Sequence, residues 1–225
     1  MDPHHRIERV FPEQLGSSVF PSEEFWHTVS ALTIGNVLGK VPGTLPRAEV
    51  KLCYDPGAVY LRFTVSEPCV RAVCREVNGR VWEDSCVEFF VAPDVRQPSR
   101  YFNLEINCLG VPLLHYNRVP RRDVDVLSPS AIGHIGLRAS LEGREAEVEQ
   151  EIPGPENWSV DVRFPISVLR AHVAISEPGP GVVWRGNFFK AAVGSGNPHY
   201  LTWSPVNVEI PDFHRPEFFG TLEFV

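Results

Sequence analysis

Tyr101-Phe102-Asn103-Leu104-Glu105-Ile106-Asn107 is the stretch of this sequence that says most about the fold. Apolar and polar side chains alternate along it with a period of two, the pattern of a β-strand with one buried and one polar face. The same alternation recurs at 59–65, 87–91, 135–141 and 159–164. Repeated half-buried strands are typical of an antiparallel sheet that is packed on one side.

Other segments bring the expected total to about ten strands, most of them bounded by Pro, Gly, Asn or Asp. They are 47–54, 145–152, 182–192, 199–203 and 219–225. Helical patterns are scarce: Ser22 can cap a short helix that starts at Glu23, and another can form at 164–169. The sequence therefore predicts an all-β fold, an antiparallel β-sandwich or jelly-roll-like domain with one or two short helical turns.

The 225 residues, 43% of them hydrophobic and 22% charged, have the composition of a globular chain. Turn-rich segments occur at 41–46, 117–130 and 178–181, but no linker and no internal repeat separates two halves. We expect residues 31–225 to form a single β-sandwich domain, with residues 1–30 as an N-terminal extension packed on it and His4 and His5 in a solvated tail.

The formal net charge of −7 bears on the partners of the protein. A negative surface argues against nucleic acid or an anionic membrane as the main partner. No apolar run approaches the ~18 residues of a membrane span, and no signal peptide is visible. Localisation stays open between the cytoplasm and secretion with a leader removed, and the oligomeric state stays open too.

Motifs for catalysis or metal binding are scarce. The five cysteines lack zinc-site spacing and lie in or beside apolar runs, so we expect free core thiols. We find no nucleophile elbow, phosphate-binding loop, zinc-protease motif or dinucleotide fingerprint. Gly194-Ser195-Gly196 is followed by Asn197-Pro198 and is interpreted as a turn.

The acidic residues are more informative. Glu88 and Glu105 lie on the polar sides of two neighbouring strand candidates, so pairing of these strands would place Glu88 near Glu105 or Asn103. Paired carboxylates suit a glycosidase when they lie ~5–5.5 Å apart for retention or ~6.5–9.5 Å apart for inversion. The same residues also suit a ligand-binding face or an ordinary solvated sheet face.

Aromatic residues near this polar face favour a sugar ligand. The apolar side of a pyranose ring can lie on an aromatic ring, while its hydroxyls bond amides and carboxylates at the rim. Trp82 follows a turn, and Phe213 lies in a proline-flanked loop with His214, the one histidine in an aromatic setting. We expect the other four tryptophans to be packing residues: Trp26, Trp158, Trp184 and Trp203.

Five segments in order make the chain similar to the family 9 carbohydrate-binding modules and their stand-alone relatives. They are Trp82-Glu83-Asp84-Ser85-Cys86-Val87-Glu88-Phe89-Phe90, residues 101–107, Trp158 to Pro165, Trp184-Arg185-Gly186-Asn187-Phe188, and Trp203-Ser204-Pro205 through Phe213-His214-Arg215-Pro216 to Gly220. The resemblance covers roughly residues 45–225.

The resemblance implies a β-sandwich that holds the end of a sugar chain between two aromatic rings. It places the first ring at Trp82, the second at Phe213 and a sugar-bonding carboxylate at Glu88. Several positions depart from the family: the second ring is commonly Trp, Glu105 stands in place of a binding Arg, and Asn103 stands in place of Gln. Family members can hold structural calcium, but no loop of spaced aspartates locates one here.

We therefore predict non-catalytic carbohydrate binding, with a saccharide held between two rings over a polar floor and with no other cofactor. The expected ligand-binding residues are Trp82, Phe213, Glu88, Asn103, Glu105, Asn107, Asp84 and His214. Two alternatives remain: a glycoside hydrolase that uses Glu88 and Glu105, and an interaction domain that has lost sugar binding.

Overall fold

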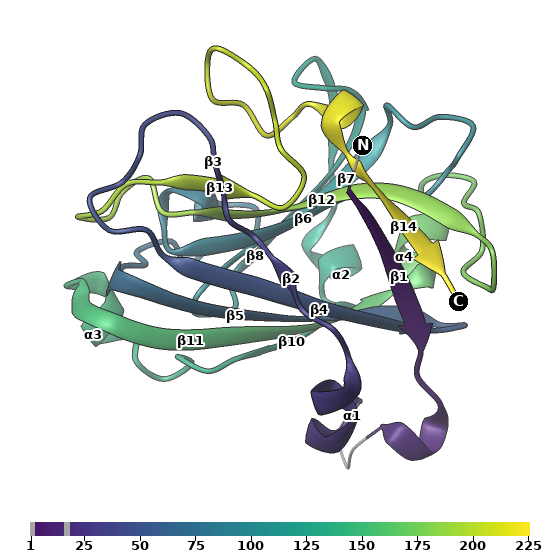
Figure 1. Ribbon diagram of the computed structural model, residues 1–225, viewed down its shortest axis with the longest axis horizontal. Coiled ribbons are helices and arrows are strands. Elements are labelled where there is room, and N and C mark those ends of the chain that lie inside the picture. Colours follow the sequence, from purple (N-terminus) through teal and green to yellow (C-terminus); the bar gives the residue numbers. More distant parts are fainter. Residues whose placement is uncertain (1–2, 16–18) are drawn as a thin grey trace.

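Two facing layers of strands form the body of the protein (Figure 1). The computed structural model describes residues 3–15 and 19–225. We name the layers after their central strands, the β5 layer and the β6 layer. The predicted all-β sandwich is confirmed, since every strand pair outside β1 is antiparallel among the described residues.

The β5 layer has the strand order β10-β11-β5-β4, with the short β2 beside β4. Its longest pairing joins β11 to β5, from Ile152 opposite Val70 to Pro165 opposite Ala58. The strand bounds are β2 Leu32–Thr33, β4 Arg47–Asp55, β5 Ala58–Val70, β10 Gly136–Ala139 and β11 Ile152–Pro165.

The β6 layer has the order β14-β12-β6-β7-β8-β9, and β13 and β3 extend it beside β12. The bounds are β3 Asn36–Val37, β6 Cys86–Ala92, β7 Tyr101–Asn107, β8 Pro112–Val119, β9 Asp123–Val126, β12 Val183–Ala191, β13 Tyr200–Thr202 and β14 Gly220–Phe224. The alternation from Tyr101 to Cys108 predicted the start of β7 and placed its end one residue beyond the observed Asn107.

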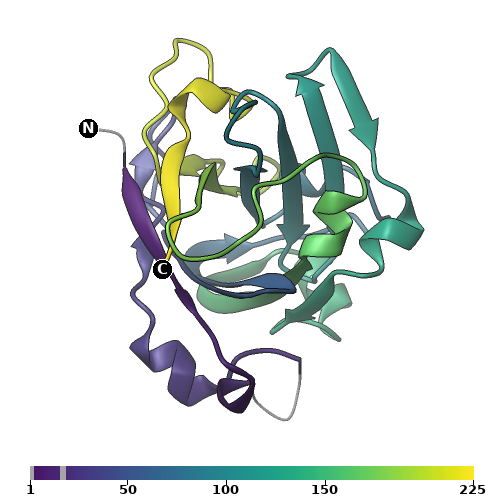
Figure 2. The same ribbon diagram turned by 90° about the vertical axis from the view of Figure 1, so that its right-hand side faces the viewer.

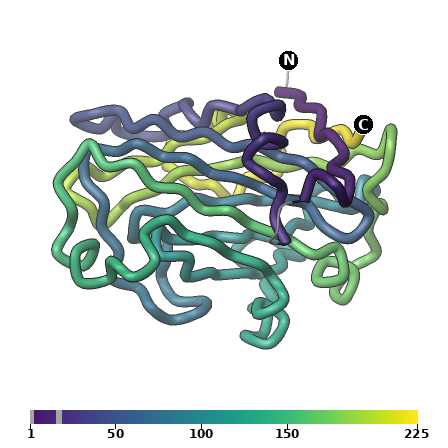
Figure 3. The backbone as a smooth tube through the Cα atoms, turned by 90° about the horizontal axis from the view of Figure 1, so that it is seen from below, coloured from purple at the N-terminus to yellow at the C-terminus, as the bar shows by residue number. Residues whose placement is uncertain are grey.

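Strand β1, His4–Arg9, connects the two layers along one side of the sandwich. It pairs in parallel with β14 through its first residues and with β4 through Glu8 and Arg9. The two termini consequently lie at the same end of the molecule (Figure 3). The expectation that His4 and His5 form a solvated tail was wrong. Since only Ile7 of this strand is fully buried, the hydrophobic pattern gave no sign of it.

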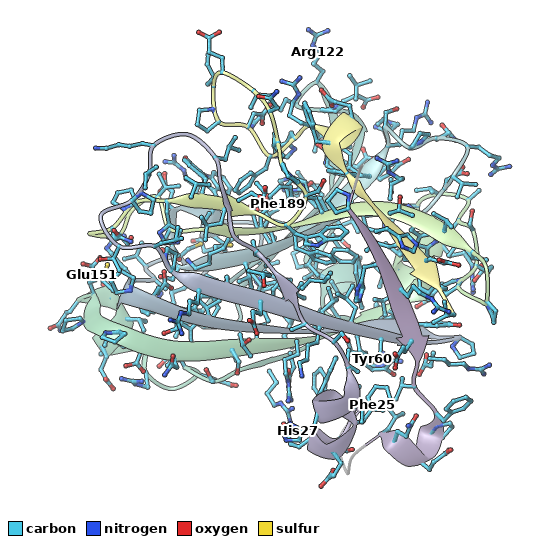
Figure 4. All side chains as sticks on the ribbon, in the orientation of Figure 1. Phe25, His27, Tyr60, Arg122, Glu151 and Phe189 are labelled. Carbon is cyan, nitrogen blue, oxygen red and sulfur yellow. The ribbon has the colours of Figure 1, made fainter. Side chains whose placement is uncertain are left out.

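The helical elements are short and lie at the margins of the layers (Figure 2). They are η1 Pro12–Gln14, α1 Glu23–Thr28, η2 Val81–Glu83, α2 Pro129–Ile132, α3 Glu145–Glu149, α4 Ile166–Arg170 and η3 Pro216–Phe218. The Ser22 hydroxyl accepts a hydrogen bond from the backbone N–H of Phe25, which confirms the predicted cap of α1. Phe25 then packs beside Tyr60 below the β5 layer (Figure 4).

The core lies between the layers because the apolar member of each alternating pair points inward. Phe89 and Phe188 of the β6 layer stack with centroids 5.0 Å apart, and Phe63 of the β5 layer meets Phe188 edge-on. The four tryptophans predicted to be packing residues are buried. The expectation of core thiols holds for Cys53, Cys86 and Cys108, which are buried, but was wrong for Cys69 and Cys74, which are partly exposed.

Residues 145–152 were wrongly predicted to be a strand. The run Glu145-Ala-Glu-Val-Glu mimics a period of two, but Ala and Glu are good helix formers and the segment folds as α3. Arg144 stabilises this helix by pairing with Glu147 one turn away, and Val148 is its one buried residue.

Strands β8 and β9 were not predicted. Leu113-Leu114-His115 in β8 breaks the alternation, and β9 lies inside the segment interpreted as turns. Residues 3–15 and 19–225 contain four short α-helices, where one or two helical turns were expected. No helix in the described part of the chain is long and apolar enough to cross a membrane. The division at residue 30 stays a prediction.

Candidate functional site

The outer face of the β6 layer carries the polar members of the alternating strands. Glu88 of β6 lies directly opposite Glu105 of β7, and Asn103 lies opposite His115 of β8. Directly opposed residues of an antiparallel pair share one face, with Cβ atoms about 4.5–5.5 Å apart. The predicted proximity of Glu88 and Glu105 is therefore confirmed by the strand register.

A cavity of about 490 Å³ opens on this face. Its size falls within the range of small-ligand sites, about 300–1,000 Å³. Six of the eight predicted ligand-binding residues line it, and Asp84 and Asn107 do not. The full lining is Trp82, Glu88, Asn103, Glu105, Leu113, His115, Asn117, Arg121, Val124, Ala191, Tyr200, Pro211, Asp212, Phe213 and His214.

Trp82 reaches the cavity from η2, the turn that leads into β6. Its indole is partly exposed, packs beside Val81 and Leu113, and has the Arg80 guanidinium 5.7 Å from its ring. An amphipathic ring in this position can support an apolar ligand face without being essential to the core.

Phe213 reaches the cavity from the loop between β13 and η3, but it is more buried than the sequence suggested. Its ring is 8% exposed and stacks on Phe189 of β12, with centroids 4.1 Å apart and planes 21° apart. Tyr200 meets the ring edge-on at 5.5 Å. Phe189 points from the β6 layer toward this loop (Figure 4). One face of Phe213 is thus occupied by protein, and a ligand is left with the other face or the edge.

A chain of amides crosses the cavity floor. The Asn117 side-chain amide donates to Asn103 Oδ1 at 2.6 Å, and the Asn103 amide donates to Glu105 Oε1 at 2.8 Å. These bonds fix the side chains of β7 and β8 relative to one another. Two acceptors of this hydrogen-bond network remain unpaired, since Glu105 Oε2 and Asn117 Oδ1 have no hydrogen-bond partner among the described residues.

Glu88 and Glu105 are both almost fully buried, with 2% and 5% of their surfaces exposed. Within the described part of the chain, the Glu88 carboxylate has neither a hydrogen-bond partner nor an ion pair. Burial, followed by repulsion from Glu105, raises the pKa of Glu88 well above its ordinary value. Burial also raises the pKa of Glu105 to about 7, although the bond from Asn103 and the charge of Arg121 oppose this. The two carboxyls therefore hold at least part of a proton near neutral pH.

The mouth of the cavity is fixed by contacts between two loops. Arg121, in the turn between β8 and β9, donates from Nη2 to Asp212 Oδ1 at 2.5 Å. Burial works against ionisation of Asp212, but Arg121 and the backbone N–H of His214 outweigh it, and the pKa of Asp212 is lowered. Asp212 and Arg121 thus balance each other's charge.

His214 shares a 2.7 Å hydrogen bond with the Tyr101 hydroxyl. Burial, with the nearby charge of Arg121, lowers the pKa of His214 to about 4. Burial also lowers the pKa of His115. Both imidazoles are consequently neutral near pH 7 and add hydrogen-bonding groups to the cavity without adding charge.

Asp84 and Asn107 lie outside the cavity and hold a loop in place. Both are fully buried, and the Asn107 amide donates to the Asp84 carboxylate at 2.9 Å. Asp84 also accepts from the backbone N–H groups of Val73 and Cys74. With their side chains engaged by the protein, they have a structural role in place of the predicted ligand contact.

Sequence reasoning did not identify five polar residues of the cavity, which are His115, Asn117, Arg121, Tyr200 and Asp212. The first two follow the same period of two on β8, so recognising that strand would have placed them beside Asn103. Arg121 lies in a turn, with φ of 59°, and nothing in the sequence connects it to Asp212 ninety-one positions later.

Metal ligands do not gather in the described part of the chain. No three His, Cys, Asp or Glu side chains there come close enough to hold a metal ion together. Glu88 and Glu105 are a pair of carboxylates without a third such ligand.

The fold and the cavity together define a class of protein. A β-sandwich that carries aromatic walls above a floor of amides and carboxylates on one outer face is a carbohydrate-binding domain in form. The chain belongs to carbohydrate-binding family 9, whose model matches residues 25–224. The resemblance stated from the five segments is confirmed, and with it a non-catalytic carbohydrate-binding role for the domain.

Solved structures agree with this assignment. A protein of Bacteroides uniformis ATCC 8492, proposed to bind carbohydrate, superposes with a TM-score of 0.85 and 32% identity over 99% of both chains. A family 9 carbohydrate-binding module of Caldicellulosiruptor kristjanssonii, solved with cellotriose, has a TM-score of 0.62 and 16% identity over 98% of this chain and 93% of its own. A family 9 module of the same organism, solved with glucose, has a TM-score of 0.63 and 15% identity over 98% of this chain and 96% of its own. A search of curated proteins gives no match.

Proposed function

We propose that the cavity on the outer face of the β6 layer is the saccharide site of this domain. A pyranose ring would lie against Trp82 and the free side of Phe213, with its hydroxyls directed toward Glu88, Asn103 and the histidines. The observation that carries this proposal is the meeting in one cavity of two aromatic side chains and a buried carboxylate without a partner.

The chemistry of the lining supports a sugar over a purely apolar ligand. Aromatic rings supply the surface that the C–H face of a sugar prefers, and amides and carboxylates accept its hydroxyl protons. A carboxylate that the protein leaves unpartnered gains most from such a donor, because a buried acceptor without a bond costs about 1–3 kcal/mol.

The geometry gives little support to hydrolysis. A glycosidase places its two carboxyls on two sides of the scissile bond. Glu88 and Glu105 are cross-strand neighbours on one floor, and both have raised pKa values, so neither is a fully ionised nucleophile near neutral pH. We propose binding without turnover. Release of nitrophenol from a panel of aryl glycosides, lost in Glu88→Gln, would contradict this.

The test of the binding proposal is a glycan array probed with the wild-type protein and with Trp82→Ala. Because the Caldicellulosiruptor modules were solved with cellotriose and glucose, the array includes β-1,4-glucans. We expect Trp82→Ala to weaken binding by at least about thirtyfold, the cost of losing an aromatic hot spot, with a melting temperature close to the wild type.

Trp82→Phe is the matched control, since it keeps a smaller aromatic platform and should retain part of the affinity. Wild-type binding to a glycan that Trp82→Ala still binds equally well would contradict the proposed site. A large fall in the melting temperature of Trp82→Ala would show that the indole serves the core.

A further inference from the structure

The floor of the cavity holds more negative charge than the protein balances. Glu88 and Glu105 are opposed across β6 and β7, and like charges in directly opposed positions destabilise a sheet. Both are nearly buried, and Glu88 has no bonded partner in the described part of the chain. Such an arrangement needs either a shared proton or a cation between the two carboxyls.

The charged groups around the pair are already occupied. Arg121, above the floor, is paired with Asp212 at 2.5 Å. Lys190, on the inward side of β12, is paired with Glu67 at 2.9 Å inside the core. His115 from β8 and His214 from the loop have lowered pKa values and carry no charge near pH 7. Cys86, beside Glu88 on β6, has a raised pKa and stays a thiol. No cation of the described chain is left for Glu88 and Glu105.

The neutral imidazole of His115 brings one N–H donor to the floor, whereas the fully buried groups there without partners are acceptors. They are the Glu88 carboxylate, Glu105 Oε2 and Asn117 Oδ1. A hydroxyl brings one proton to such a site, whereas an ammonium group brings three protons and a positive charge. The aromatic rings of Trp82 and Phe213 favour a cation as well, because the face of an aromatic ring attracts positive charge.

We propose that this cavity selects saccharides that carry a free amino group, with the ammonium bound between Glu88 and Glu105. The inference rests on the proposed saccharide site and adds the chemical class of its ligand. Glu88 and Glu105 are then the residues that determine specificity, while the aromatic rings bind the sugar ring whatever its substituent.

Three trisaccharides with the same β-1,4-linked backbone test the proposal, because they differ in the substituent at C2. They are the trimer of glucosamine, the trimer of N-acetylglucosamine and cellotriose, which carry an ammonium, an acetamide and a hydroxyl. Isothermal titration calorimetry at pH 6.5 in low salt with EDTA measures each affinity without a bridging metal ion. We expect the glucosamine trimer to bind at least about tenfold more tightly than either neutral trimer, from one charge-assisted contact.

Glu105→Gln is the critical variant, because glutamine can still accept the bond from Asn103 but carries no charge. Its preference for the glucosamine trimer should fall to near equality with cellotriose. Glu209→Gln is the matched control, since it removes one negative charge from the exposed loop at the rim and should keep the preference. The wild-type heat of binding should also vary with the ionisation enthalpy of the buffer, as the ammonium displaces the proton that the pair holds.

The outcomes separate the inference from the function on which it rests. Equal or tighter binding of a neutral trimer by the wild type contradicts the amino-sugar inference and leaves the saccharide site standing. A preference that survives in Glu105→Gln also contradicts it. Failure of all three trimers and of the whole array contradicts both the inference and the proposed function.

Discussion

Two buried carboxylates on opposite sides of the β6 layer have opposite surroundings. Glu67 of β5 points into the core, where it accepts a 2.7 Å bond from Trp158 Nε1 and pairs with Lys190 at 2.9 Å. Glu88 is buried to nearly the same degree, but it faces the cavity and has no bonded partner in the described part of the chain. Burial alone therefore does not distinguish the two roles, whereas the presence of a partner does.

The comparison indicates how the same strands provide both stability and binding. Along β12, Lys190 points inward to Glu67 while its neighbour Phe189 points outward and supports Phe213. The inner face satisfies its charges internally, as a stable core requires. The outer face leaves acceptors unsatisfied beside aromatic rings, which is costly for the free protein and useful for a ligand.

The largest effect is expected from breaking the core pair. Lys190→Met leaves Glu67 as a buried charge without its cation, and such a loss costs about 3–5 kcal/mol of unfolding free energy. Urea denaturation of the variant and the wild type measures it. The double variant Glu67→Gln with Lys190→Met should recover part of the loss, because no charge is left buried. A Lys190→Met protein as stable as the wild type would remove the distinction between the two carboxylates.

A smaller loss of unfolding free energy is expected from changing Asn107. The sequence predicted this residue in the binding site, but in the structure it holds a loop in place. Asn107→Ala removes a hydrogen-bond partner of Asp84 and of the backbone N–H groups of Leu109 and Val111. We expect this to lower the free energy of unfolding by about 1–3 kcal/mol. Denaturation should show the loss, and the folded variant should bind sugar as the wild type does. Loss of sugar binding with unchanged stability would return Asn107 to the ligand site.

The smallest effect on stability is expected at Glu88, and it has the opposite sign, because removing this carboxyl should stabilise the protein at high pH. Because the pKa of this carboxyl is higher in the folded than in the unfolded protein, folding favours its protonated form. The wild type should therefore lose stability as the pH rises above the ordinary carboxyl pKa and through the raised values of the pair, of which that of Glu105 is about 7.

Glu88→Gln removes the part of this loss that Glu88 causes, while the raised pKa of Glu105 keeps the rest. Melting temperatures measured from pH 5 to 9 should fall less steeply for the variant than for the wild type, while its affinity for sugar decreases. If the melting temperatures of the variant and the wild type fall in parallel across this pH range, the pKa of Glu88 is not raised in the folded protein.

Much of the fold could be predicted from the sequence where the alternation is strict. The position of β7, to within one residue, and the proximity of Glu88 and Glu105 followed from period-two patterns in neighbouring strands. Strand β1 could not be predicted, because only Ile7 of it is fully buried and its pairing with β14 and β4 spans most of the chain. Segment α3 shows the reverse error, since its charged residues imitate a strand.

The site could be predicted in part for the same reason. Asn103 and Asn107 are equivalent in the pattern of β7, yet Asn107 is at the strand end, where its amide bonds the Cys74 carbonyl and the Asp84 carboxylate. The exposed ring expected at Phe213 is largely buried against Phe189, a contact between a loop and a distant strand that no local pattern reveals. The Arg121–Asp212 pair likewise depends on the tertiary fold.

The most direct test of the account is a crystal structure of the protein with the best glycan from the array. We expect the sugar in the cavity of the β6 layer, with its ring against Trp82 and with Glu88 in hydrogen-bonding contact. A sugar bound elsewhere, such as on the outer face of the β5 layer, with Glu88 still without a ligand, would contradict the central claim that this unpartnered carboxylate belongs to the binding site.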